Sequence, residues 1–359
     1  MKKRRFFLFI LPILLVSGCW DEEQYKDVTI VPLVGLEAQS EGVKSMYAFP
    51  IFLNGKITYA QSEGEGLSTR ASRSDANHSS MEGLDLAHLE VVLLDGELAK
   101  KELYTYIDMF FRTPRHRLGS YIAIIEGEMK DYFNPTGVEG EVSDYYPELL
   151  RTGVIFNIIP DITLQGTATL LFDDQIDLSL PYIIIEEESG APKLNGVALF
   201  SNHRYTGKTL SSKESMLANL MRKKKGKYTR LSYMWKKGEE ESPITIDVSK
   251  VKRKWDITTK KIDASYTLEV NLEEFPHDQL DKKKTISEIE SFLSKEIEKE
   301  FNEVIKKTQE AKSDIVGFGR HVHAFHRELW KKGDWQETYA TLPIEVKVKV
   351  KVTRTGITN

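Results

Sequence analysis

The chain has one cysteine, Cys19, among 359 residues. A single thiol excludes a framework of intramolecular disulfides and leaves no pair of cysteines for a structural zinc site. The sequence also lacks the HExxH motif of zinc peptidases, the GxSxG motif of serine hydrolases and a calcium loop with spaced Asp and Asn residues. The usual sequence signs of hydrolytic and metal-dependent catalysis are therefore missing.

Positive charges are also outnumbered by negative charges once the first residues are set aside. The net charge is −4, but Lys2, Lys3, Arg4 and Arg5 stand together at the start of the chain. The other residues hold 46 Lys and Arg against 54 Asp and Glu, which leaves a net charge of −8. A body of this sign is not suited to non-specific binding of nucleic-acid phosphates. With 40% hydrophobic and 29% charged residues, a chain of this length is expected to fold into two or three domains.

The first 19 residues have the pattern of a lipoprotein signal peptide. The basic residues are followed by an apolar segment, Phe6–Val16, and then by Ser17, Gly18 and Cys19. As a helix this segment rises about 16 Å, roughly half of a bilayer's hydrocarbon core, so it is too short to span a membrane comfortably. Small residues before a cysteine are typical of the bacterial lipobox, in which the thiol accepts a diacylglyceryl group before cleavage.

We therefore expect residues 1–18 to be a lipoprotein signal peptide that is removed. Cys19 would then anchor the remaining 341 of the 359 residues to the outer face of the cytoplasmic membrane. The alternative interpretation is an ordinary secretory signal, or an uncleaved anchor, with an incidental cysteine.

The rest of the chain predicts alternating strands and helices. Apolar or alternating runs predict strands at residues 28–36, 47–53, 89–96, 121–126, 182–185, 194–205 (as a hairpin), 244–255, 262–272 and 344–352. Amphipathic spacing predicts helices at residues 97–111, 145–156, 214–221 and 285–312. Residues 61–80 are rich in Gly, Ser and Asn without an apolar period, and predict a mobile surface loop.

The acidic run Glu186–Glu188, followed by Ser, Gly, Ala and Pro, is interpreted as a linker. It places a domain boundary at about residue 190, between an N-terminal region, 19–190, and a C-terminal region, 191–359. The C-terminal region is expected to form two subdomains, at about 191–243 and 244–359.

Three groups of residues have the types that carry chemistry, and each has a plainer interpretation. His321, His323 and His326 are better explained as partly exposed or capping side chains than as metal ligands, because a helix places only the last two on one face. Asn202–Thr209 resembles a phosphate-binding loop but lacks its first glycine. Arg222–Lys227 is interpreted as a solvated loop, with contact to lipid headgroups or an acidic partner as the alternative. No group of residues supports catalysis, a metal or a cofactor.

Short segments along the chain occur in the order of a known family: residues 18–21, 88–99, 111–118, 194–210, 314–319 and 346–356, with Trp330 and Trp335 after the fifth. Together they resemble the Ger(x)C family, the lipoprotein C subunits of nutrient germinant receptors in endospore-forming bacteria. The segments depart from the family pattern at Ala87, Thr113 and Arg115, and the chain departs most over residues 60–80 and 219–243.

The resemblance implies an α+β fold of three mixed α/β domains, with central, largely antiparallel sheets flanked by helices. It implies a non-catalytic lipoprotein without a cofactor, which is required with integral membrane subunits of the A and B types for nutrient-triggered spore germination. The location implied is the spore's inner membrane. The residues leave two other functions open: a substrate-binding lipoprotein of a membrane transporter, and a lipid-anchored cell-wall hydrolase.

The resemblance also assigns individual residues. Cys19 is the implied site of the N-palmitoyl and S-diacylglycerol groups, and the other motif residues implied to be structural are Trp20, Asp21, Asp314, Gly317, Phe318 and Gly319. Glycines on both sides of Phe318, after a long helix, predict a chain reversal at positive φ with the phenyl ring buried against the sheet. A surface that contacts a partner is the alternative role for this motif.

Overall fold

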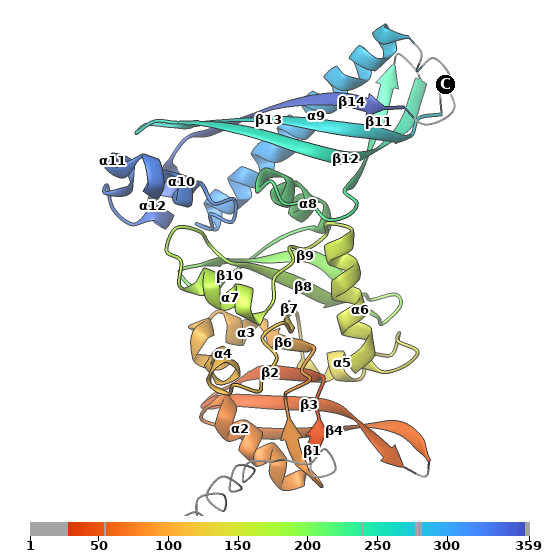
Figure 1. Cartoon of the computed structure of the whole chain (residues 1–359), viewed down its shortest axis with the longest axis vertical. Coiled ribbons are helices and arrows are strands. Elements are labelled where there is room, and N and C mark those ends of the chain that lie inside the picture. Colours follow the sequence, from red (N-terminus) through yellow and green to blue (C-terminus); the bar gives the residue numbers. More distant parts are fainter. Residues whose placement is uncertain (1–27, 54, 238–239, 277–279, 281, 356–359) are drawn as a thin grey trace, which may run out of the picture.

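Two β-sheets, one of eight strands and one of four, divide the protein into two lobes that lie end to end (Figure 1). The computed structural model describes residues 28–355 apart from 54, 238–239, 277–279 and 281. The predicted leader and the motif residues Cys19, Trp20 and Asp21 lie outside the described residues. The first lobe comprises residues 28–210 and the second residues 230–354, and helix α8, Ser212–Met221, lies at their junction.

The first lobe contains a mixed sheet in the order β10-β9-β8-β7-β6-β2-β3-β4. Its four central strands, β2, β6, β7 and β8, run parallel, and antiparallel strands extend the sheet at both edges. The strands are β2 Leu33–Gln39, β3 Gly42–Leu53, β4 Lys56–Gly66, β6 Val91–Asp95, β7 Tyr121–Ile125, β8 Ser179–Ile185, β9 Pro192–Ser201 and β10 Arg204–Leu210. A short parallel pair, β1 Val28–Ile30 and β5 Gly83–Asp85, lies beside it.

Helices cover both faces of the eight-stranded sheet, so its central strands are apolar at successive positions. In β6, Val92 and Leu94 face a core that includes α2, α3, α4 and α7, whereas Val91 and Leu93 face a second core with α5 and α6. The helices are α2 Thr69–Ala76, α3 Gly96–Ala99, α4 Leu103–Arg112, α5 Met129–Phe133, α6 Val142–Ile155 and α7 Leu164–Leu171, with a 3₁₀ turn, η2, at Asn77–Ser79.

The mobile loop predicted at residues 61–80 is wrong, because this segment forms the end of β4 and then helix α2. The lack of a side chain at the glycines of β4 is what allows α2 to pack closely against this strand. A Cβ atom on Gly64 would lie 2.3 Å from the backbone nitrogen of Ala76, so α2 packs directly on the strand backbone. Ser68 begins the helix by accepting a hydrogen bond from the N–H of Ala71.

The eight-stranded sheet continues across the boundary predicted at residue 190. The acidic run is a tight hairpin turn between β8 and β9, in which the N–H of Glu186 donates to the Ala191 carbonyl and Gly190 has a φ of 68°. The second predicted division, at residues 243–244, falls inside β12, which pairs with β11 along this stretch. The turn-forming residues therefore mark a hairpin within the eight-stranded sheet. The division between the two sheets lies at other positions in the chain.

The second lobe contains a sheet in the order β11-β12-β13-β14 with a long helix against it (Figure 1). β13 and β14 are parallel and the other pairs are antiparallel, so the predicted α+β class is confirmed. The elements are β11 Arg230–Lys237, β12 Glu240–Ile257, β13 Ile262–Glu274, α9 Lys283–Glu310, α10 Phe318–Phe325, α11 Arg327–Trp330, α12 Trp335–Thr341 and β14 Ile344–Arg354. The apolar stripe predicted on the long helix is confirmed, with Ile289, Leu293, Ile297, Phe301, Val304 and Ile305 buried.

Polar residues of α9 cover the open edge of β14. The alternation predicted for this strand is confirmed, since Val346, Val348 and Val350 are buried and the lysines between them are exposed. Outward N–H groups of four alternate residues donate to side chains spaced four apart on the helix: Val346 to Asn302 (3.0 Å), Val348 to Glu298 (2.9 Å), Val350 to Ser294 (2.9 Å) and Val352 to Glu290 (2.8 Å). The helix therefore protects this edge from pairing with another chain.

This ladder predicts a measurable cost for its best-connected member. Asn302 both accepts from the N–H of Val346 and donates to its carbonyl, at 3.0 and 3.1 Å. Asn302→Ala is expected to lower the free energy of unfolding by about 1–3 kcal/mol, because two half-buried backbone groups lose their partners. Chemical denaturation measures the change, with Lys306→Ala on the exposed face of α9 as the matched control within about 0.5 kcal/mol of the parent. Equal stabilities for the two variants would contradict the ladder's role.

Candidate functional site at the junction of the lobes

Asp314 lies at the centre of the junction, in the segment that joins α9 to α10. Its side chain is fully buried, and its carboxylate accepts four hydrogen bonds. Oδ1 accepts from the backbone N–H groups of Gly317 (2.8 Å) and Phe318 (3.1 Å). Oδ2 accepts from the N–H of Gly319 (2.7 Å) and from the indole N–H of Trp335 (3.0 Å). The carboxylate thereby satisfies the first backbone donors of α10, where the helix dipole is positive.

Asp177, which precedes β8 in the first lobe, meets Asp314 from the other side. The N–H of Asp177 donates to the Asp314 carbonyl at 3.1 Å, and the N–H of Asp314 donates to Oδ2 of Asp177 at 2.8 Å. Gln336 of α12 donates to Oδ1 of Asp177 at 3.2 Å. We call these four residues, Asp177, Asp314, Trp335 and Gln336, the inter-lobe clasp. Because all four are buried, the clasp joins the two lobes through polar contacts that water does not reach.

Burial raises the pKa of both carboxyl groups in the clasp. The pKa of Asp177 is raised to about 7 by the loss of water, while the hydrogen bond from the Asp314 N–H opposes the rise and the Asp314 charge adds to it. Burial also raises the pKa of Asp314, against the hydrogen bonds donated by Gly319, Gly317 and Trp335. The charge of Asp314 disfavours ionisation of Asp177 nearby. Asp314 receives more donors, so we assign the negative charge to Asp314 and a proton to Asp177.

The raised pKa predicts a fall in stability with rising pH. An unfolded aspartate has a pKa of about 3.9, so between about pH 4 and 7 the folded chain holds a proton at Asp177 that the unfolded chain has lost. This contribution is full below about pH 4 and is lost as the pH rises through 7, at up to about 1.4 kcal/mol per pH unit. Asp177→Asn removes the titration and is expected to flatten the slope between pH 5 and 7 in denaturation curves. Parallel slopes for the parent and the variant would contradict this assignment.

The motif residues after Asp314 each have a distinct structural role. Gly317 has a φ of 87°, in the left-handed region that favours glycine, and it begins α10. Phe318 is fully buried, and its ring centroid lies 4.5 Å from that of Trp255 on β12. Gly319 does not have positive φ as the sequence predicted, because it lies within α10. It is small for a different reason: a Cβ there would lie 2.4 Å from Trp335 Nε1 and 2.5 Å from the carbonyl oxygen of Gln175.

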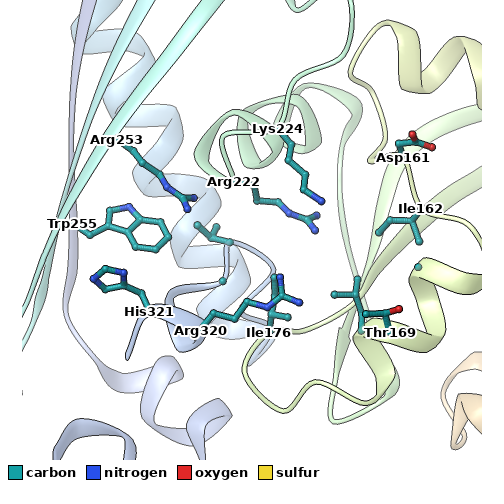
Figure 2. A pocket seen from close by; sticks show the side chains of 14 residues that line it. Asp161, Ile162, Thr169, Ile176, Arg222, Lys224, Arg253, Trp255, Arg320 and His321 are labelled. Atoms are coloured by element: carbon teal, nitrogen blue, oxygen red, sulfur yellow. The ribbon is translucent and has the colours of Figure 1, made fainter. Parts of the chain in front are cut away.

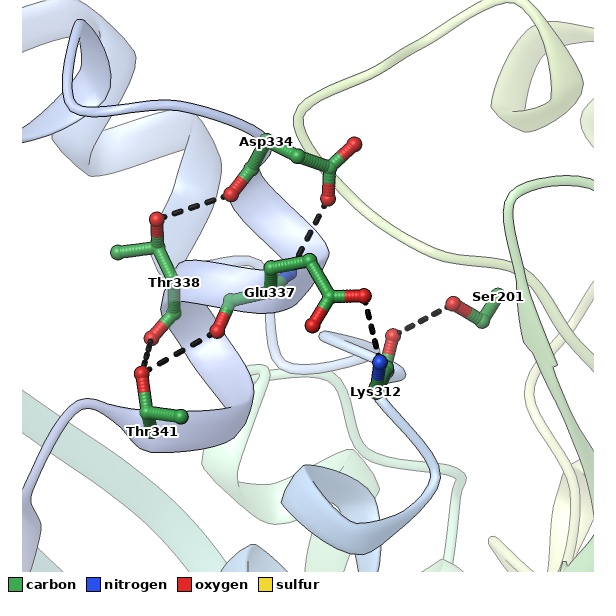
Figure 3. A network of polar contacts seen from close by, with 6 residues as sticks. All are labelled: Ser201, Lys312, Asp334, Glu337, Thr338 and Thr341. Atoms are coloured by element: carbon green, nitrogen blue, oxygen red, sulfur yellow. Dashed lines mark hydrogen bonds and ion pairs between the residues drawn. The ribbon is translucent and has the colours of Figure 1, made fainter.

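A second set of polar contacts joins the lobes beside the clasp (Figure 3). Ser201, at the end of β9, donates to the carbonyl of Lys312 at 2.8 Å, just after α9. Lys312 in turn forms an ion pair with Glu337 of α12 at 2.5 Å, and Asp334 caps that helix by accepting from the N–H of Glu337 at 3.0 Å. The ends of α9 and α12 are therefore fixed to each other and to the first lobe.

A pocket of about 640 Å³ opens next to the clasp, with walls from both lobes (Figure 2). Asp161, Ile162 and Thr169 line it from the first lobe, and Arg253 and Trp255 line it from β12 of the second. Four basic side chains also line it: Arg222, Lys224, Arg320 and His321. The basic run predicted to be a solvated loop thus contributes two cations to an inter-lobe pocket.

The other candidate residues do not form a catalytic or metal site in the described part of the chain. Within residues 28–355 and their stated gaps, no group of three or more His, Cys, Asp or Glu side chains is close enough to hold a metal ion. His321 packs against Trp255 and His323 against Trp330, with ring centroids 5.7 and 4.9 Å apart. The segment that resembles a phosphate-binding loop is the β9–β10 hairpin, with Asn202 at its turn (φ 47°). Fold and site thus define a two-lobed α+β protein with structural carboxylates at its junction.

Comparison with known proteins places this architecture in one family. A family described as "Spore germination protein N-terminal domain" matches residues 21–185, and one described as "Spore germination B3/ GerAC like, C-terminal" matches residues 195–356. Both relate to spore germination proteins and together they cover most of the chain. The protein belongs to the Ger(x)C family, as its sequence motifs predicted.

Two named relatives match over nearly their whole length. Spore germination protein GerQC of Bacillus cereus is 25% identical over 374 residues, covering 99% of both chains. Spore germination protein KC of Bacillus subtilis (strain 168) is 22% identical over 399 residues, covering 98% of this chain and 95% of its own. The crystal structure of the GerBC protein has the same fold, with a TM-score of 0.59 and 19% identity over 89% of this chain and 97% of that one.

None of the helices in the described residues is both long enough and apolar enough to cross a membrane. The longest, α9, has 28 residues, but lysines and glutamates line its exposed face.

Proposed function

We propose that this chain is a non-catalytic, lipid-anchored subunit of a nutrient germinant receptor, acting with integral membrane subunits of the A and B types in the spore's inner membrane. The observation that carries the proposal is the full-length match to two germination families in the correct order, with named relatives that are spore germination proteins. The similarity covers both lobes, so the role proposed belongs to the whole chain and not to a shared domain.

A non-catalytic role fits the chemistry of the junction. The two carboxyl groups with raised pKa values, Asp177 and Asp314, are the groups most like catalytic acids in the described residues. Both are buried, and their oxygens accept hydrogen bonds from the protein's own backbone and side chains. Their raised pKa values are explained by burial at the junction where these residues join the two lobes, and no substrate is needed to account for them.

The proposed anchor orients the molecule. Val28, the first residue of β1, is nine residues after Cys19 in the sequence, and a chain of that length reaches at most about 30 Å. β1 lies at the end of the first lobe that is far from the second lobe (Figure 1). We therefore infer that the first lobe lies next to the bilayer and its protein partners, and that the second lobe points away from the membrane.

The transporter alternative receives less support from the fold. A substrate-binding lipoprotein is expected to have two similar α/β lobes around a cleft. Here the lobes differ in kind, since one has eight strands covered on both faces and the other has four strands with one long helix. For the hydrolase alternative, no group that could hold a metal ion is present within the described residues.

Replacement of Cys19 tests the proposed anchor in living spores. In Cys19→Ala spores we expect the chain to leave the membrane fraction and the nutrient response to fall at least about tenfold, because tethering supplies the local concentration for weak docking. Response to a non-nutrient trigger should be unchanged. As the matched control, an uncleaved transmembrane segment fused before residue 20 should restore the nutrient response.

Two results would overturn the proposal. One is an intact-mass measurement that finds residues 1–18 retained or the Cys19 thiol unmodified in the membrane-bound chain. The other is a normal nutrient response in spores from which the whole chain has been removed and in which no other family member is present.

A further inference from the structure

The pocket at the lobe junction gathers four cationic side chains from three segments that are far apart in the sequence. Arg222 ends α8, Lys224 follows it, Arg253 comes from β12 and Arg320 from α10. Figure 2 shows Arg222, Lys224 and Arg320 extending toward the open centre of the pocket from different elements. Asp161 is the one acidic residue that lines the pocket among the described residues. The walls of the pocket therefore carry an excess of positive charge, although the chain as a whole has a negative net charge.

Most of this positive charge has no carboxylate to neutralise it. Arg320 pairs with Asp173 at 2.7 Å. Arg222 donates only to the Ser179 hydroxyl at 3.3 Å, and Arg253 donates to a backbone carbonyl. In the part of the chain that the structure describes, no carboxylate oxygen lies within 4 Å of the charged nitrogens of Arg222, Lys224 or Arg253. Three cations thus face one pocket without an ion pair.

The closeness of these charges lowers the pKa values of two of them. Partial burial and repulsion from Arg320 lower the pKa of Arg222 to about 10, while the charge of Asp314 opposes the fall. Burial and repulsion from Arg222 and Arg320 lower the pKa of Lys224. With a pKa of about 10, Arg222 still carries its charge at neutral pH. These neighbouring cations repel one another, and an anion in the pocket would be attracted to all of them.

We propose that this pocket binds a small organic oxyanion with at least two negative charges, phosphate or carboxylate. Arg222, Lys224 and Arg320 would hold its charged groups, and the apolar side chains of Ile162 and Ile176 would contact the rest. The volume, about 640 Å³, is in the range of small-molecule sites. This ligand goes beyond the proposed receptor role and stands on the pocket's geometry alone.

Binding at this position would act on the relation between the lobes. Ile162 and Ile176 belong to the first lobe. Arg320 belongs to α10 in the second lobe and follows closely after Gly317, the glycine that begins that helix. A ligand held by residues on both sides stabilises the arrangement in which those residues converge. Occupancy of the pocket is therefore expected to stiffen the junction.

The test measures thermal unfolding of the full-length chain, purified in detergent, with defined anions at constant ionic strength. Pyrophosphate and citrate serve as phosphate and carboxylate probes, and acetate and chloride serve as monovalent controls. We expect at least one polyvalent probe to raise the unfolding temperature by about 2 °C or more beyond the chloride control, with saturation. Whether the pocket prefers phosphate or carboxylate groups is read from which of the two probes, pyrophosphate or citrate, binds more tightly.

A pair of neighbouring lysines separates a site from general attraction. Lys224 lines the pocket, whereas Lys225, also exposed, does not. Lys224→Ala is expected to weaken probe binding at least about tenfold, and Lys225→Ala to change it less than about twofold, because both remove one charge but only one removes a contact. Both should keep the parent's unfolding temperature without ligand. The absence of any polyvalent effect, or equal weakening in both variants, would overturn the proposal, and an acidic partner protein would then be the better occupant.

Discussion

Gly319→Val is expected to prevent accumulation of the folded chain. A Cβ at position 319 would lie 2.4 Å from Trp335 Nε1 and 2.5 Å from the backbone oxygen of Gln175. Neither neighbour can move cheaply, because the indole is held by Asp314 and the oxygen belongs to the backbone of the first lobe. Valine adds two further methyl groups, so the substitution forces the lobes apart or unfolds α10, at a cost of several kcal/mol, about the size of a typical total stability.

The matched control is the same substitution at an open glycine. Gly119 is exposed, does not have positive φ, and has no heavy atom within 4 Å of the point where a Cβ would lie. Gly119→Val should therefore give a normal yield and unfolding midpoint. The comparison uses the soluble or detergent-soluble yield and the midpoint of both variants. A Gly319→Val chain that folds normally but fails to join its partners would show that this motif is an interface and not a clasp.

Asp314→Ala is expected to lower the free energy of unfolding by about 3–5 kcal/mol, which corresponds to a fall of roughly 10 °C in the unfolding midpoint. The substitution leaves three backbone N–H groups and the indole of Trp335 buried without an acceptor. Loss of the buried charge returns part of this cost, since the carboxylate no longer has to be removed from water.

Asp314→Asn replaces one of the two carboxylate oxygens of Asp314 with an amide nitrogen. Each carboxylate oxygen accepts two of the four donors, so an amide in either orientation points its own N–H groups at two of them. The asparagine variant is therefore expected to lie between the parent and the alanine variant. Asp173→Asn weakens a partly exposed ion pair with Arg320 and keeps an oxygen that can accept from the N–H of Gln175, so it should cost less than about 1 kcal/mol. An alanine variant as stable as Asp173→Asn would contradict the role given to Asp314.

The sequence predicted best those features that repeat along one element. The buried stripe of α9 and the alternation of β14 depend on spacings of about 3.6 and 2 residues, which a single sequence displays directly. The reversal at Gly317 was predicted from local composition and is present. These features need no knowledge of which segments meet in space.

The missed features all depend on close approach between distant segments. Helix α2 has few apolar residues, and its place on β4 comes from the missing side chains of Gly64 and Gly66. Asp177 contacts Asp314 across 137 residues, and no periodic pattern marks either partner. The basic pocket combines a visible run of charges at residues 222–227 with single arginines on β12 and α10. Only the run gave a signal, and without the distant arginines a solvated loop was the simpler interpretation.

The clasp and the proposed anchor together describe one mechanical arrangement. The lipid would hold the first lobe near the membrane subunits, and the clasp fixes the second lobe to the first. In this proposed arrangement, occupancy of the basic pocket would bias how firmly the junction is held.

Co-purification from spore membranes tests the receptor assignment most directly. The chain, tagged at its C-terminus and expressed from its own locus, is recovered from detergent-solubilised inner membranes of dormant spores. We predict that integral membrane subunits of the A and B types are recovered with it in comparable amounts. Recovery of the folded parent chain alone, from membranes in which those subunits are present and intact, would contradict the account.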